Sequence, residues 1–104
     1  MPYIKQEDRL RYDARINALI TDILIHKSSA GDMNYIITRL LDAAYNFKEP
    51  SYSKINEAIG VLECAKMELY RRVAVLYENK KIELNKDVYK DVYYCGCGHC
   101  TGDK

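Results

Sequence analysis

The most reactive side chains of this 104-residue chain gather close to its C-terminal end. Cys95, Cys97 and Cys100 fall within a few residues of one another, and His99 stands among them. Thiolate and imidazole groups are the ligands that zinc prefers in proteins. Cys95, Cys97 and Cys100 are therefore candidate zinc ligands, and zinc is the one cofactor that the sequence suggests.

A structural zinc site needs four ligands in a tetrahedral arrangement. His99 and Cys100 are adjacent, which makes it hard to direct both at one ion, so the missing ligand would be His26, Cys64 or a side chain of another chain. The alternative is an inert tail whose reduced thiols can be oxidised. The segment from Cys97 to Cys100 also looks like the active-site tetrad of protein disulfide isomerases. That chemistry requires a thiol at a helix N-terminus after a strand, and no strand–helix unit is expected here.

Four basic residues are candidates for binding a small anionic ligand such as a nucleotide. They are Arg39, Lys66, Arg71 and Arg72, which would line a pocket between helices or between subunits. Lys66 attracts notice because it falls on the apolar stripe of a long helical segment. A structural role is the alternative, in which its methylenes extend over the core or its ammonium group pairs with Glu63 one turn earlier.

Common enzyme signatures are absent from the sequence. It contains no glycine-rich phosphate loop, no nucleophile elbow and no His-Glu-x-x-His motif, and its only histidines are His26 and His99. Glu57, Glu63 and Glu68 also lack the Glu-x-x-Glu spacing of the all-α nucleotide pyrophosphohydrolases. We therefore expect a binding protein and no enzyme.

Charge and hydropathy limit the partners and the cellular compartment that we expect for the protein. Sixteen basic and fifteen acidic side chains give a net charge of +1, so no strong field attracts nucleic acid. The start of the chain lacks the apolar segment of a signal peptide, and no apolar run approaches the roughly 18–20 residues that span a bilayer. We expect a cytoplasmic protein without membrane contact.

The elements that would position these residues are helices. Apolar residues recur with helical spacing over residues 7–27, again after Asp32, which we expect to cap the second helix, and over residues 52–78. Pro50 separates the last two helices, and Ser51 or Ser53 is expected to cap the third. The predicted fold is all-α, a three-helix up-down-up bundle with a long third helix. Residues 1–89 form the predicted domain, and residues 90–104 a flexible Cys-rich tail.

Each predicted helix carries an apolar stripe that is expected to face the core. The three stripes comprise Tyr12, Ile16, Leu19, Ile20, Ile23 and Leu24; then Met33, Ile36, Ile37, Leu40, Ala43 and Ala44; and finally Ile55, Ala58, Ile59, Leu62, Ala65, Leu69, Tyr70, Val73, Leu76 and Tyr77. The opposite face of the third helix carries Gly60, Cys64, Met67 and Val75. Either this helix is central and buried on both sides within one chain, or the second face is a self-association surface that makes a homo-oligomer.

Four segments carry a resemblance to a known group of proteins. They are Met1–Arg9, Gly31–Leu41, Ala58–Arg72 and Asp87–Tyr89. Through them, residues 1–89 resemble a small uncharacterised family of bacteria and their phages. The resemblance implies no activity, cofactor or site residue, and the Cys-rich end lies outside it.

Overall fold

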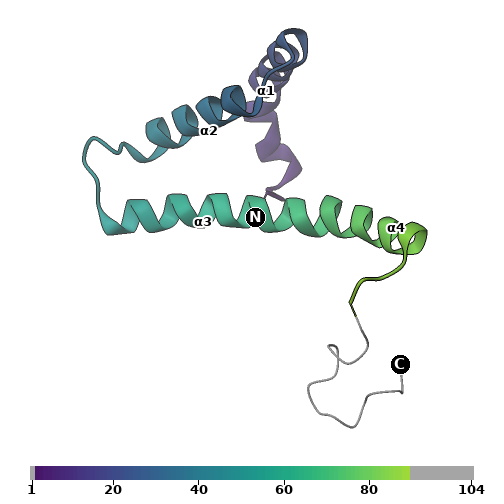
Figure 1. Cartoon of the computed structure of the whole chain (residues 1–104). Helices are drawn as coiled ribbons and strands as arrows, with labels where there is room; N and C mark the ends of the chain where they lie inside the picture. Colours follow the sequence, from purple (N-terminus) through teal and green to yellow (C-terminus); the bar gives the residue numbers. More distant parts are fainter. Residues whose placement is uncertain (1, 90–104) are drawn as a thin grey trace. The chain divides into compact units, whose positions relative to one another are not determined.

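A computed structural model describes residues 2–89 of the chain, and most of this part is helical (Figure 1). Its elements are α1 (Gln6–His26), α2 (Ala30–Tyr45), α3 (Tyr52–Leu69), the π-helical segment η1 (Tyr70–Ala74) and α4 (Val75–Asn85). Within residues 2–89 there is no strand. The all-α prediction is therefore confirmed, including a long third helix, since α3, η1 and α4 follow one another without a loop. The predicted tail, residues 90–104, lies outside the described residues.

The chain divides into two compact units, Met1–Lys66 and Met67–Lys104, and each is described by itself. The first unit holds α1, α2 and most of α3. The second holds the end of α3, the π-helical segment and α4.

Helix α1 begins without a side-chain cap and ends in a well-formed turn. Its first turn carries Glu7 and Asp8, where the positive end of the helix dipole favours acidic groups. At the other end Lys27 adopts a left-handed conformation with φ 50°, and the N–H of Ser28 donates to the carbonyl oxygen of Ile23 at 3.1 Å. This bond satisfies one of the carbonyl groups that a helix end leaves unpaired.

Helix α2 begins three residues earlier than the sequence suggested. Ser29 is the N-cap, and its hydroxyl oxygen accepts a hydrogen bond from the N–H of Asp32 at 3.1 Å. The Asp32 carboxylate in turn accepts from the N–H of Ser29 at 2.9 Å. The prediction that Asp32 caps this helix is thus wrong, because the two side chains form a reciprocal capping box in which Asp32 is the third helical residue.

Helix α3 is capped by Ser51, the first of the two serines predicted for this role. The Ser51 hydroxyl accepts from the N–H of Lys54 at 3.2 Å. The Lys54 ammonium donates to the carbonyl oxygen of Glu49 at 2.7 Å and lies 3.4 Å from that of Asn46. These bonds tie the connection that contains Pro50 to the first turn of α3.

The long helix contains a π-helical turn that its sequence does not reveal. The N–H of Val75 donates to the carbonyl oxygen of Tyr70, five residues earlier instead of four. A π turn holds one extra residue, so the side chains that follow it are rotated by about 100° relative to a continuous α-helix. Leu76 therefore leaves the face that Leu69 and Val73 share in the second unit.

Burial is slight throughout the described part of the chain. Ala58, 5% exposed, is the one fully buried residue among residues 2–89. Most of the partly buried apolar residues lie in the first unit, among them Leu19, Ile23, Ile36 and Leu41, while Glu68 and Ala74 are partly buried in the second unit. Most of each predicted stripe is exposed instead of forming a bundle core. Between residues 2 and 89, no helix combines the length and the apolar character needed to cross a membrane.

Candidate functional site

The four basic candidates lie on three helical segments. Arg39 is on α2, where its guanidinium group donates to the Tyr35 hydroxyl at 2.8 Å and lies 5.7 Å from the centre of the Tyr35 ring. Arg71 and Arg72 are consecutive residues of η1. Lys66 belongs to α3 in the first unit, and no described interaction joins it to Arg39. Arg71 and Arg72 are neighbours only because they are consecutive, and consecutive side chains on a helix do not face one another.

Lys66 and Arg71 each form an ion pair with a residue one turn earlier. Lys66 Nζ lies 3.3 Å from Glu63 Oε1, the pair that the structural alternative anticipated. Arg71 Nε lies 2.6 Å from Glu68 Oε1, and the Glu68 side chain is only 13% exposed. Pairs with this spacing usually stabilise a helix surface by about 0.2–0.5 kcal/mol. Arg39, Lys66 and Arg71 thus each interact with a neighbour on the same stretch of helix.

Apolar side chains are exposed along all the helices of the first unit. On α1, Ile16 and Ile20 are 49% and 44% exposed, and on α2 Leu40 is 60% exposed. On α3, Ile59 and Leu62 are 58% and 43% exposed. These positions recur with the helical spacing predicted from the sequence, so the exposed groups on each helix lie on one side of it.

The four residues proposed for self-association are also accessible. A Cβ atom added to Gly60 would meet nothing within 4 Å, and Cys64 is a free, exposed thiol. In the second unit Met67 is 61% exposed and Val75 38% exposed. Each of the four positions is therefore accessible within its own unit.

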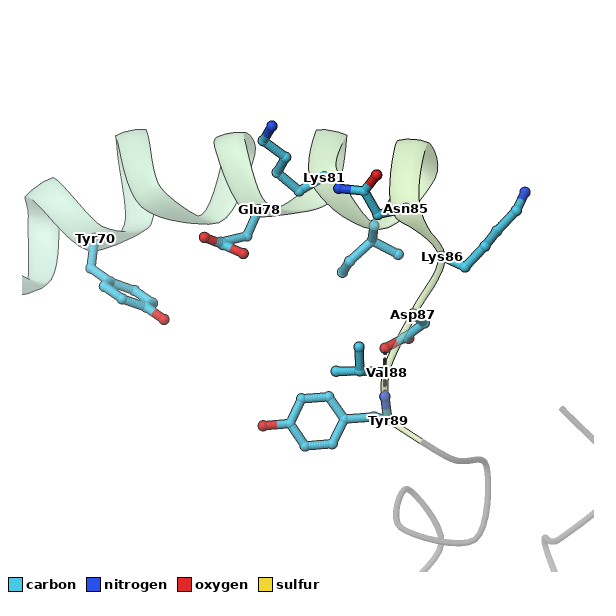
Figure 2. Close-up of a pocket in the computed structure, with 9 residues that line it drawn as sticks. Tyr70, Glu78, Lys81, Asn85, Lys86, Asp87, Val88 and Tyr89 are labelled. Atoms are coloured by element: carbon cyan, nitrogen blue, oxygen red, sulfur yellow. Dashed lines mark hydrogen bonds between the residues drawn. The ribbon is translucent and has the colours of Figure 1, made fainter.

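A pocket of about 440 Å³ lies in the second unit and was missed by sequence reasoning (Figure 2). It is formed where the chain turns back after α4. Its lining comprises Tyr70, Glu78, Lys81, Ile82, Asn85, Lys86, Asp87, Val88 and Tyr89. The sequence signal for it was weak, since Asp87–Tyr89 stood out only as one of the four segments that carry the resemblance.

The candidate metal ligands Cys95, Cys97 and Cys100 lie outside the described residues. His26 and Cys64, the two proposed supplementary ligands, belong to different helices, α1 and α3. His26 Nδ1 lies 2.8 Å from the carbonyl oxygen of Asp22. In residues 2–89, no three histidine, cysteine or acidic side chains are placed to hold a metal ion together.

Comparison of the chain with curated proteins and with solved structures gave no match. A family model matches residues 1–88, which include every helix found in the described part of the chain and all of the pocket lining except Tyr89. The chain therefore belongs to the family described as "Domain of unknown function (DUF6899)".

Proposed function

We propose that this chain is a non-enzymatic, self-associating helical binding protein, an accessory protein of bacterial or phage origin. The observation that carries the proposal is the exposure of the apolar stripes on α1, α2 and α3. The suggested origin rests on the resemblance of the four sequence segments described above. The occupant that we assign to the exposed stripes is a second copy of the same chain.

The low stability of isolated helices in water is the reason to expect a partner. Helices shorter than about 12–15 residues are marginal in water, and longer ones also gain most of their stability in proteins from packing an apolar face. Helix α2 has 16 residues, yet Met33, Ile37 and Leu40 on its stripe are exposed. A partner that covered these side chains would supply the packing that the described chain does not.

The composition favours another copy of the chain as that partner. The net charge is only +1, so two copies would not repel one another strongly. Both copies present the same apolar stripes, which suits an interface of two-fold symmetry in which one surface patch contacts itself. Exposed apolar surface of this extent is typical of interaction sites and uncommon on monomers.

The alternative function, sequestration of a nucleotide or another small anion, has less support. Arg39, Lys66 and Arg71 already interact with Tyr35, Glu63 and Glu68. An anion would have to compete with these neighbours. We therefore retain self-association as the function that the described contacts favour.

A matched pair of charge substitutions tests the proposal. Met67→Glu places a carboxylate on the accessible face of the long helix, where an unpaired charge in a buried contact would be costly. Asn79→Glu adds the same charge to an already polar position on α4. Sedimentation velocity of the unchanged protein and both variants would give their association constants.

We expect Met67→Glu to weaken assembly by roughly tenfold or more, the loss typical of an uncompensated charge at an interface. Asn79→Glu should assemble like the unchanged protein. Equal assembly of all three proteins would exclude the Met67 face from the interface. Exclusively monomeric protein would overturn self-association altogether.

A further inference from the structure

The pocket of the second unit exists because the chain reverses direction at Lys86. This residue has φ 71° and ψ 152°, a region that residues with a side chain rarely occupy. Its N–H donates to the carbonyl oxygen of Ile82 at 2.8 Å, which fixes the reversal to the last turn of α4. The N–H of Tyr89 then donates to Asp87 Oδ1 at 2.9 Å. Val88 and Tyr89 are thereby held beside the helix.

The pocket lining divides by chemistry on the two sides of the helix. Figure 2 shows Tyr70, Glu78, Val88 and Tyr89 on one side, while the ammonium group of Lys81 extends to the opposite side. Lys81 Nζ lies 5.5 Å from the centre of the Tyr77 ring, and Tyr77 is not part of the lining. The side that holds the two tyrosines therefore has a carboxylate and no Lys81 charge.

Glu78 contributes a carboxylate to this pocket, and Lys81 does not pair with it. Lys81, three residues later, is spaced to pair with it, yet the Lys81 ammonium group lies over Tyr77 instead. Among the interactions described for residues 2–89, Glu78 has neither an ion pair nor a hydrogen bond. Its carboxylate is therefore available to a ligand.

We propose that this pocket binds an organic cation, an alkylammonium or guanidinium group, with Glu78 as the counter-ion. The faces of Tyr70 and Tyr89 would attract the cation through their ring electrons, and Ile82 and Val88 would contact its methylene groups. A guanidinium group can also form two parallel hydrogen bonds with a carboxylate. An anion would be repelled by Glu78, and a neutral apolar ligand would desolvate the carboxylate without replacing its hydrogen bonds.

This chemistry has two sources, a free organic amine or guanidine and the side chain of a lysine or arginine on another polypeptide. A pocket of about 440 Å³ falls in the range of small-molecule sites and also admits one long side chain. The site is independent of the proposed self-association, because it is complete within residues 70–89.

The test uses the full chain and three probes. Their binding is measured by NMR chemical shifts and by isothermal titration calorimetry. Butylguanidinium represents a free cation, acetyl-Gly-Arg-Gly-amide represents a polypeptide side chain, and butylurea is the neutral counterpart of the first. We expect shifts at the amides of residues 78–89 with butylguanidinium, with the peptide or with both. Tighter binding of the peptide would identify a polypeptide as the source, and tighter binding of butylguanidinium a free ligand.

Substitutions distinguish a specific binding site from a general attraction of cations to the charged helix. Glu78→Gln preserves shape and removes the charge, so we expect cation binding to weaken roughly tenfold. Tyr89→Leu removes one aromatic wall and should weaken it by about threefold or more. Glu83→Gln removes an equal charge from α4 outside the pocket lining and should leave binding unchanged. Circular dichroism of each variant would establish that α4 remains helical.

Three outcomes would overturn the proposal. Equal binding of butylurea and butylguanidinium would show that charge is not recognised. Equal losses in Glu78→Gln and Glu83→Gln would reduce the effect to the net charge of the helix. Absence of any shift in residues 78–89 with both cations at millimolar concentration would mean that the pocket is not a cation site.

Discussion

The N–H of Val75 donates to the carbonyl oxygen of Tyr70 in the middle of the long helix. This five-residue spacing inserts one extra residue into a helix whose sequence otherwise fits an α-helical period. The change in register divides the apolar residues of the second unit between two faces, with Leu69 and Val73 on one and Leu76 on another. Turns of this type occur frequently at functional sites, and this one opens at Tyr70, a wall of the pocket.

Deletion of Ala74 tests the importance of the π turn. Removal of one residue should restore a continuous α-helix without rotating Leu76, because the π turn already accommodates one residue more than an α-helical turn. We expect helical circular dichroism and assembly both to be retained, because the residues after the turn keep their orientation. Weaker assembly of the deletion variant in sedimentation would show that the π turn itself contributes to association.

Gly60→Ala separates the stability of α3 from its contacts with a partner. Alanine in a helix interior is favoured over glycine by roughly 0.5–1 kcal/mol, and the new methyl group would meet nothing within 4 Å in the chain. If another helix approaches Gly60 closely, the substitution should nevertheless weaken assembly. Asn56→Ala, on the same helix, is the control for helix propensity alone. Stronger assembly of Gly60→Ala would argue against a close contact at this residue.

Ser29→Ala should destabilise the first unit through the start of α2. The substitution leaves the N–H of Asp32 without its acceptor, and loss of a serine cap costs about 1 kcal/mol. The neighbouring Ser28→Ala leaves the capping box intact and should change the free energy of unfolding by less than about 0.5 kcal/mol. Urea denaturation followed at a helical wavelength would measure both. Equal effects of the two substitutions would contradict the observed capping box.

Lys66→Met tests whether this lysine is structural. The pair with Glu63 is largely exposed to solvent, so its loss should change the free energy of unfolding by less than about 1 kcal/mol. Glu63→Gln, which removes the same pair from the other side, should have a similarly small effect. A thermal shift with a nucleotide that disappears only in Lys66→Met would instead favour an anion site.

The sequence predicted where the helices lie because apolar spacing directly reflects the helical period, but the long helix continues to Asn85, beyond its predicted end at residue 78. Helix α1 begins and ends within one residue of the predicted bounds 7–27. The start of α2 was misplaced because Ser29 and Asp32 are both good caps, and only the geometry of their two hydrogen bonds shows which residue comes first. Periodicity identifies which side chains share a face, but it does not say what covers that face.

The π turn and the pocket could not be predicted for different physical reasons. Leu69, Val73 and Leu76 fit an ordinary α-helical stripe, so their spacing conceals the extra residue at Tyr70–Ala74. The pocket depends on the backbone conformation of Lys86, and lysine has no preference for a positive φ. The unpaired state of Glu78 likewise depends on where Lys81 extends its ammonium group.

The most direct test of self-association measures molar mass and helicity in the same dilution series. If copies of the chain stabilise one another, light scattering should give a multiple of 12.1 kDa at micromolar concentration. On dilution the mass and the helical circular dichroism should then fall together, because helices that lose their partner lose the packing that stabilises them. A mass of 12.1 kDa with concentration-independent helicity over the same range would contradict the account.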